Sequence, residues 1–247
     1  MGLKFVSLLL ALTVTSDAYA GGLRMQAGWP LPIAQQYLPE TLSQQEACKD
    51  VGKQPDGSYQ FLSDCPGRSL SPDGRFALVQ KIQGDNQLPV EFQDAQGRTL
   101  VKLPSLTDDM PYAATWSPNS RWIMVNHHVG SFMDELQLFE VIGHSAVERS
   151  RLVKSAARLA TRRYPCLPRD MVLPNGVRWS RDSRRIILVT VSAPYSCTIF
   201  GRRKGGTWHS LLMIGDVATG RIEPGSVRVQ PDNKPFETPK DDVYSAF

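Results

Sequence analysis

Three short turn phrases, each followed at once by an apolar stretch, constrain the fold of this chain more than any other feature. The phrases are SPDGR at 71–75, SPNSR at 117–121 and SRDSR at 180–184. The stretches after them read FALV, WIMV and RIILV, and they are rich in residues that favour β-strands. A turn that recurs in front of a strand is typical of proteins built from repeated sheets. The sequence therefore predicts an all-β fold with three similar units.

A glycine marks a second turn in every unit. Gly97, Gly143 and Gly220 each follow an apolar strand and precede a polar residue, a position that suits a hairpin turn with positive φ. The phrase and the glycine are 26 residues apart in the first two units and 40 apart in the third. Each unit is therefore predicted to hold four antiparallel strands. The expected first strands are 112–116 and 176–179, the third strands are 90–92, 136–141 and 211–214, and a fourth strand is 99–103.

These units resemble the WD-like β-propeller repeats of the TolB and tricorn type, over residues 70–227. The first phrase matches that family's Ser-Pro-Asp-Gly-Arg turn in full, the second has Asn119 and Ser120 in place of Asp-Gly, and the third lacks the proline. The resemblance implies a propeller-like fold with a tryptophan, Trp116 or Trp179, between neighbouring blades. Three blades are fewer than the four to eight that usually close a ring, so either residues 21–69 supply a degenerate blade, or the propeller is open or incomplete, or two copies complete one another. Such blades serve scaffolds, peptidase gates and binding platforms alike, so the resemblance says little about activity.

The start of the chain has the pattern of a secretory signal peptide. Residues 1–20 contain Lys4, an apolar run at 5–14 and a small-x-small ending, AYA, before Gly21. No other stretch has the length of a transmembrane helix. The prediction is a periplasmic or extracellular protein without a transmembrane anchor. Its single domain, 21–247, divides into an N-terminal cap or degenerate blade (21–69), three blade-like repeats (70–227) and a Pro-rich tail (228–247).

Four cysteines follow the signal peptide, and an even number in an exported protein indicates two disulfides. None belongs to a CxxC pair, which argues against a zinc knuckle or a thioredoxin-type centre. Three connectivities are possible, and we favour Cys48 with Cys65 and Cys166 with Cys197. The reason is topological: in an antiparallel unit, the loop before the first strand and the loop between the second and third strands emerge at one end. Both long insertions of the third unit occupy those positions, and each contains one cysteine.

Two helices are expected. Residues 145–148, SAVE, have the capping-box pattern, and apolar residues continue at helical spacing to 163, so a helix is predicted that begins with this box and continues through 149–163. It would replace or follow the fourth strand of the second unit. In the N-terminal segment a short helix is predicted at 42–50 and a strand at 58–62.

The two insertions of the third unit are basic and aromatic, and these residue types are enriched at interface hot spots. We interpret them as a binding surface for another protein with an acidic surface, although a solvated charged rim has the same composition. The formal net charge of +4 is modest and disfavours general nucleic-acid binding. A second copy is a further expected partner if the ring is incomplete. The candidate binding residues are Arg162, Arg163, Tyr164, Arg169, Tyr195, Arg202, Arg203, Lys204 and Trp208.

Catalytic patterns are sparse. His127 and His128 follow a predicted strand, with Asp108, Asp109, Asp134 and Glu135 in nearby loops. A metal or general-base site is conceivable there, but adjacent residues of a strand point to opposite faces, which prevents two imidazoles from binding one ion. No nucleophile elbow, HExxH, phosphate loop or dinucleotide fingerprint occurs. The sequence therefore assigns no catalytic residue, metal or cofactor.

The leading hypothesis is a non-enzymatic, exported protein-binding module that recognises its partner through one face of a propeller-like domain. A periplasmic inhibitor or immunity protein that blocks a toxin's active site is a special case. The alternative is a metal-dependent or His/carboxylate-dependent hydrolase or lyase that uses His127, His128 and the neighbouring carboxylates.

Overall fold

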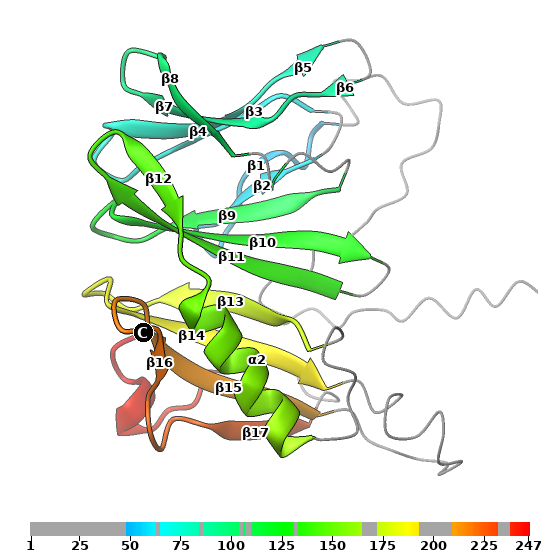
Figure 1. Cartoon of the computed structure of the whole chain (residues 1–247), viewed down its shortest axis with the longest axis vertical. Helices are drawn as coiled ribbons and strands as arrows, with labels where there is room; N and C mark the ends of the chain where they lie inside the picture. The colour runs from blue at the N-terminus through cyan, green and yellow to red at the C-terminus, as the bar shows by residue number, and fades with distance from the viewer. Residues whose placement is uncertain are drawn as a thin grey trace, which may run out of the picture.

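The computed structural model confirms an all-β architecture with one α-helix in the part of the chain that it describes. That part comprises residues 48–62, 65–83, 86–103, 106, 110–130, 133–164, 172–192, 209–231 and 238–247. The predicted signal peptide and nearly all of the predicted helix at 42–50 lie outside these residues. Three antiparallel sheets lie one above another in the molecule, in the order of the three repeats (Figure 1).

Each sheet contains one predicted unit, and its strands are hydrogen-bonded in chain order, except that β17 pairs with β15 beside β16. The first sheet comprises β3 (Gly67–Leu70), β4 (Phe76–Gln80), β7 (Val90–Asp94) and β8 (Thr99–Leu103), with a small hairpin of β5 (Ile82–Gln83) and β6 (Asn86–Gln87) between β4 and β7. The second comprises β1 (Gly52–Lys53), β2 (Tyr59–Phe61), β9 (Tyr112–Trp116), β10 (Trp122–Gly130), β11 (Met133–Ile142) and β12 (Ser145–Glu148). The third comprises β13 (Pro174–Trp179), β14 (Arg185–Ser192), β15 (His209–Asp216), β16 (Arg221–Ile222) and β17 (Arg228–Pro231). The predicted hairpin glycines all have positive φ: 79° at Gly97, 59° at Gly143 and 64° at Gly220.

The described part of the N-terminal segment does not form a blade of its own. β2 is the strand predicted at 58–62, and it pairs with β9, so β1 and β2 extend the second sheet. β3 then supplies the first strand of the first sheet. A disulfide joins Cys48 to Cys65, as predicted, and ties β1 and β2 to the start of β3. Cys166 and Cys197 lie outside the described residues.

The predicted helix is present as α2 (Arg151–Arg163), but its predicted start is wrong. The four residues of the supposed capping box form β12, which pairs with β11 as the outer strand of the second sheet. Gly143 and His144 close a two-residue hairpin, so the chain reverses and continues as a strand. The actual N-cap, Ser150, makes no side-chain capping bond. The helix therefore follows the fourth strand, one of the two alternatives that the sequence left open.

The three turns of the repeated phrase share the same hydrogen bonds, although their residues differ. In the first turn, Ser71 Oγ donates to Asp73 Oδ1 at 2.7 Å and accepts the N–H of Phe76 at 3.0 Å. The N–H of Arg75 also donates to Asp73 Oδ1. The same three bonds recur in the second and third turns, around Ser117 with Asn119 and around Ser180 with Asp182. Asn can replace Asp because only an acceptor oxygen is required.

The turns also bond to one another across the stack. The N–H of Asp73 donates to Ser120 Oγ at 3.0 Å, and the N–H of Asn119 donates to Ser183 Oγ at 3.0 Å. Ser120 and Ser183 have φ of 60° and 61°, in the left-handed region that L-residues seldom adopt. Gly74 holds the same position in the first turn. The serine hydroxyl thus explains why two turns depart from Asp-Gly: each serine supplies the acceptor for the preceding sheet.

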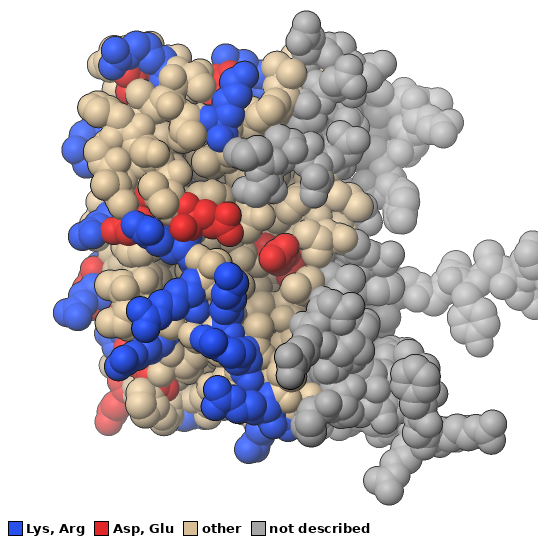
Figure 2. All heavy atoms as spheres, in the orientation of Figure 1, with Lys and Arg blue, Asp and Glu red and all other residues tan. Residues whose placement is uncertain are grey.

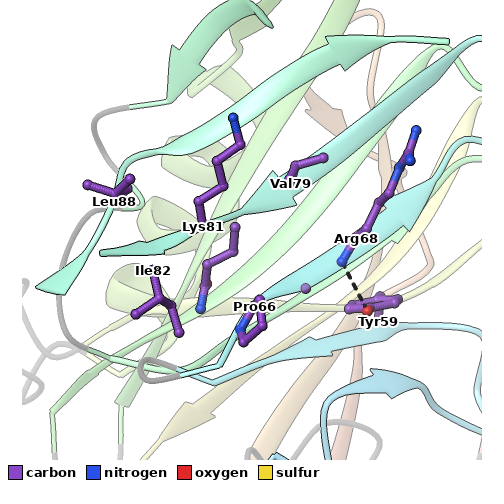
Figure 3. Close-up of a pocket in the computed structure, with 9 residues that line it drawn as sticks. Tyr59, Pro66, Arg68, Val79, Lys81, Ile82 and Leu88 are labelled. Atoms are coloured by element: carbon purple, nitrogen blue, oxygen red, sulfur yellow. Dashed lines mark hydrogen bonds between the residues drawn. The ribbon is translucent and has the colours of Figure 1, made fainter. Parts of the chain in front are cut away.

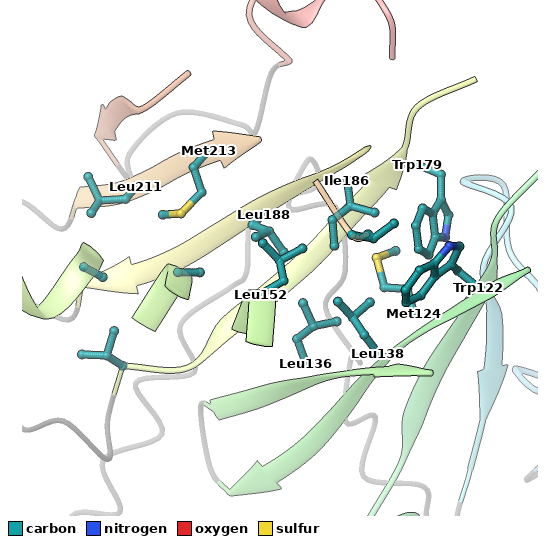
Figure 4. Packing of buried hydrophobic residues seen from close by; sticks show 14 residues of the cluster. Trp122, Met124, Leu136, Leu138, Leu152, Trp179, Ile186, Leu188, Leu211 and Met213 are labelled. Carbon is teal, nitrogen blue, oxygen red and sulfur yellow. The ribbon is translucent and has the colours of Figure 1, made fainter. Parts of the chain in front are cut away.

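Two hydrophobic clusters fill the spaces between the sheets, and both predicted tryptophans lie there. Trp116 Nε1 donates to Ser69 Oγ of the first sheet, and Trp179 Nε1 donates to the Thr115 carbonyl of the second. Each tryptophan therefore binds the sheet before its own. The cluster between the first and second sheets includes Phe61, Phe76, Leu78, Phe92, Tyr112 and Ile123. The cluster between the second and third sheets includes Met124, Leu136, Leu138, Ile186, Leu188 and Met213, with Leu152, Ala156 and Ala160 of α2 (Figure 4).

The outer face of the third sheet is covered by the last residues of the chain. Tyr244, in the 3-10 helix η3 (Asp242–Tyr244), packs on Ile187, Leu212 and Ile214 and is 1% exposed. Its hydroxyl donates to the Ser226 carbonyl at 2.6 Å. The carbonyl of Ala246 accepts the N–H of Arg181 in the third turn. This described end of the Pro-rich tail therefore packs along the domain, where another sheet would otherwise lie.

We predict that Ser120→Ala destabilises the protein by about 1 kcal/mol, because it removes the cross-sheet bond and keeps the left-handed backbone. Ser120→Gly should be close to neutral, since relief of a left-handed strain of about 1 kcal/mol offsets the lost bond. Urea unfolding of both variants measures the difference. The converse control is Gly74→Ser. It places an L-residue in the left-handed conformation, and in the described part of the chain the first turn has no preceding sheet whose N–H could bond to the new hydroxyl, so this variant should be less stable than the wild type. Equal stability of the wild type and the alanine variant would show that the hydroxyl does not join the sheets.

Candidate functional site

The strand order brings the two long connections of the third unit to one end of the third sheet. Pro174, at the start of β13, pairs with Thr190 of β14. Ser192, at the end of β14, pairs with His209, at the start of β15. Residues 165–171 lead from α2 to β13, and residues 193–208 join β14 to β15, so the first connection ends, and the second begins and ends, at the edge marked by Pro174, Ser192 and His209. We call this the loop end, and it lies on the right in Figure 1.

Three of the nine candidate binding residues are in the described part of the chain. Arg162 and Arg163 are exposed in the last turn of α2, and Tyr164 is the residue after the helix. The N–H of Tyr164 donates to the Ala160 carbonyl at 2.9 Å, and its side chain packs against the cluster between the second and third sheets. Figure 1 shows that α2 runs toward the side of the third sheet where the loop end lies. The remaining candidates, Arg169, Tyr195, Arg202, Arg203, Lys204 and Trp208, lie outside the described residues, so their placement stays a prediction.

Helix α2 also carries basic residues that the sequence reasoning did not include in the binding surface. All five of its charged side chains are cationic and exposed, and the helix contains no acidic residue. Figure 2 shows Lys and Arg side chains gathered over the part of the molecule where α2 lies. These five side chains form no ion pair with any residue that the structure describes. The five are Arg151, Lys154, Arg158, Arg162 and Arg163.

The other side of α2 fixes the helix against the third sheet. Leu152 lies so close to Gly215 that a Cβ there would come within 2.6 Å of its side chain. Ser155 Oγ donates to the Gly220 carbonyl at 2.8 Å. The helix therefore has a fixed rotation about its axis, and the sequence spacing alone decides which side chains face outward.

A buried His–Asp pair lies in the second sheet near the loop end. His128 Nδ1 and Asp134 Oδ1 are 2.9 Å apart on paired positions of β10 and β11. Burial raises the pKa of the Asp134 carboxyl, although the hydrogen bond with His128 and the charges of both histidines act to lower it. The other ring nitrogen of His128, Nε2, is buried and has no hydrogen-bond partner among the described residues. In the tautomer whose Nδ1–H donates to Asp134, Nε2 is a hydrogen-bond acceptor.

A hydrogen-bonded contact between the second and third sheets lies two residues before His128 on β10. Asn126 of β10 binds the N–H and the carbonyl of Gly176 in β13, both at 2.8 Å. His128 lies two residues beyond Asn126 on the same face, and Pro174 lies two residues from Gly176, toward the same end. Asn126 makes the contact with the third sheet, so His128 is not needed for that bond.

His127 does not join this pair. It alternates with His128 along β10, and it pairs with Tyr112 and Glu135 on the side that faces the first sheet. The two imidazoles therefore lie on opposite faces of the sheet, as strand geometry predicts. Within the described residues, no three His, Cys, Asp or Glu side chains lie together as a metal site would require. Asp108 and Asp109 are outside those residues.

A shallow depression lies on the first sheet, and sequence reasoning did not predict it (Figure 3). It has a volume of about 740 Å³, and its rim carries two cations, Arg68 and Lys81. The backbone N–H of Arg68 donates to the Tyr59 hydroxyl at 3.0 Å, which places the phenol ring at its edge. Lys81 is half exposed, and its Nζ is 2.8 Å from Glu91 Oε2. The remaining lining residues are Pro66, Gly67, Val79, Gln80, Ile82 and Leu88.

Glu91 is the centre of a hydrogen-bond network beside this depression. Besides Lys81, its Oε2 accepts Gln93 Nε2 at 2.6 Å and Thr99 Oγ1 at 2.7 Å. Burial acts to raise the pKa of Glu91, but the bonds from Lys81, Thr99 and Gln93 outweigh it and lower the pKa to about 2. The carboxylate therefore stays ionised and satisfies three donors on the outer face of the first sheet.

Comparisons with known proteins do not identify a family or a function for this chain. No protein-family model matches the chain, and no curated protein matches it in sequence. In the described part of the chain, no helix combines the length and the apolar character that crossing a bilayer requires.

We predict that the stability of the wild type falls more steeply with acid than the stability of a Glu91→Gln variant. A lowered pKa means that the Glu91 carboxylate contributes stability above pH 4.5, and this contribution is lost as the pH falls toward 2. Urea midpoints measured from pH 6 to pH 2 should fall more steeply for the wild type than for Glu91→Gln. Thr99→Val, which removes one donor and keeps the carboxylate, should give an intermediate slope. Parallel curves for wild type and Glu91→Gln would contradict the role assigned to the network.

Proposed function

We propose that this chain is an exported, non-enzymatic module of the periplasm or cell envelope that binds another protein through the loop end of its third sheet. The observation that supports the proposal is the exposed cationic end of α2, which lies toward the side of the third sheet where the two long connections attach (Figure 1). Arg162 and Arg163 are exposed and form no ion pair with a described residue. Arg and Tyr side chains on a fixed helix end offer charge and apolar area at a low entropic cost.

The propeller-like, TolB-type interpretation is part of the same proposal. It is supported by three successive antiparallel sheets whose connecting turns share the same hydrogen bonds. The stack is an open one in this interpretation, because the C-terminal residues cover the outer face of the third sheet. In such a stack the loops at one end form a common surface, as they do on a propeller face.

Export is proposed on the chemistry of the N-terminal segment. The sequence pattern of residues 1–20 favours a signal peptide. The Cys48–Cys65 disulfide is compatible with an oxidising compartment. A partner with an acidic surface fits the cations of the loop end, and an inhibitor or immunity protein is the most specific form of the proposal.

We predict that the double variant Arg162→Glu/Arg163→Glu loses at least 90% of its partner in a capture experiment from native envelope extract. Reversing two rim charges converts attraction into repulsion at the proposed surface. The matched control is Lys49→Glu/Lys53→Glu, which changes the net charge equally on exposed residues near β1. The amount of captured protein is measured by quantitative mass spectrometry. Equal capture by both double variants would rule out the loop end as the binding surface.

The alternative hydrolase or lyase is favoured by one observation, the pairing of buried His128 with partly buried Asp134, in which His128 Nε2 has no hydrogen-bond partner among the described residues. His128 is the group that would accept a proton from water or substrate in such an enzyme. The variant His128→Gln separates the two functions. A binding module should keep its partner after this change, whereas an enzyme should lose turnover on an ester and glycoside panel while the double arginine variant remains active.

A further inference from the structure

We infer that the partner-binding surface continues along the whole length of α2 and that it receives an acidic helix of the partner protein. This inference rests on the proposed function and extends it from the loop end to a defined ligand geometry. It is carried by the spacing and the exposure of the cations on α2, and by the absence of ion pairs between them and any described residue.

Four of the cations form one line along the helix. Residues 151, 154, 158 and 162 follow each other at steps of three or four, and residues at these steps share one face. At about 1.5 Å per residue, the line from first to last is roughly 16 Å long. All four side chains are exposed, whereas Leu152, Ala156 and Ala160 on the opposite side are buried. The line leads to the loop end, so it is continuous with the proposed binding surface.

Helix stability does not account for this line of charges. Like charges at i and i+4, as for Lys154 with Arg158, destabilise a helix by about 0.2–0.5 kcal/mol per pair. Arg151 and Lys154 also lie in the first half of α2, where the helix dipole disfavours cations, and the first turn has no acidic residue. Cations in the last turn are favourable, and the side-chain stem of Arg151 packs closely against Gly220, so a structural role covers Arg151, Arg162 and Arg163. Lys154 and Arg158 need another explanation, which a bound anionic partner provides.

The exposed face lacks what a helix needs to enter a membrane surface. An interfacial helix buries an apolar side in the lipid, but the apolar side of α2 packs on the third sheet. The contact surface is polar and cationic, as in electrostatically guided protein association. A partner protein therefore fits the face better than a lipid bilayer does.

The spacing selects the shape of the acidic segment. In a partner helix, carboxylates at steps of three or four residues are about 5–6 Å apart. This spacing equals the spacing of the cations on α2, so each carboxylate can lie opposite one cation. In an extended strand, side chains of one face recur at about 6.6–6.8 Å, so three steps exceed the line by roughly 4 Å. An acidic helix laid along α2 can therefore pair with all four cations at once.

The test uses the full chain and two fluorescent peptides of equal composition and net charge. In one peptide, alanine-rich and helical, Glu residues occur at steps of three and four on one face; in the other, the same Glu residues are distributed around the helix. We expect the first peptide to bind at least tenfold more tightly in fluorescence anisotropy. The variant Lys154→Glu/Arg158→Glu should abolish this difference, while Lys49→Glu/Lys53→Glu should retain it. The first variant keeps a like-charge pair at i and i+4, so α2 is not weakened relative to the wild type, and circular dichroism checks the fold.

Other outcomes would overturn the inference. Equal affinity for the two peptides would show that α2 binds acidic peptides through net charge alone, whatever the arrangement of their Glu residues. Tighter binding to phosphatidylglycerol vesicles or to polyphosphate than to the spaced peptide would identify a phosphate-bearing ligand instead. If envelope capture is lost in Arg162→Glu/Arg163→Glu but unchanged in Lys154→Glu/Arg158→Glu, the proposed function stands and the extension along α2 fails. If neither variant changes capture, both fail.

Discussion

The hydrogen bonds between successive turns set how the three sheets are arranged. An N–H in the first turn reaches a serine hydroxyl in the second, and an N–H in the second turn reaches a serine hydroxyl in the third. Because the donors are backbone groups and the acceptors are the fourth residues of the repeated phrase, the register between sheets follows from the phrase itself. The two buried clusters then supply most of the stabilisation, but they lack directional bonds. The turns and the two tryptophan N–H groups provide that direction.

Sequence patterns predicted the repeated sheets well, because turn residues and strand residues have strong local preferences. β8 and β9 have the predicted bounds, and the three hairpin glycines have the expected backbone sign. Prediction failed where a local pattern competed with tertiary pairing. SAVE at 145–148 has helix-start letters, but the hairpin at Gly143 delivers these residues to the edge of β11, where Ala146 is buried. The role of Ser120 and Ser183 could not be predicted either, since their partners are 47 and 64 residues away in the sequence.

For the candidate site, the sequence predicted the convergence of two connections but missed most of the cationic helix face. The convergence depends only on strand alternation, which follows from counting strands. The exposed helix face depends on which side of α2 is buried. That side is fixed by Gly215 and Gly220, because the absence of a side chain at these positions lets Leu152 pack on Gly215 and Arg151 pack on Gly220. The periodicity of Arg151, Lys154 and Arg158 was nevertheless present in the sequence and could have indicated one exposed stripe. The pairing of His128 with Asp134 required the register of β10 and β11, which residue types alone do not determine.

The two outer surfaces of the stack differ from its interior junctions, and this has a consequence for how such a chain could lengthen. Tyr244 and its neighbours cover one outer surface, and the ionised Glu91 network occupies the other. Both surfaces are specialised for being outermost, whereas the two junctions use interchangeable bonds. A duplicated unit inserted between existing sheets would meet matching turns on both sides. A unit appended after the third sheet would have to displace a buried aromatic ring, so growth by internal duplication is the less costly evolutionary route.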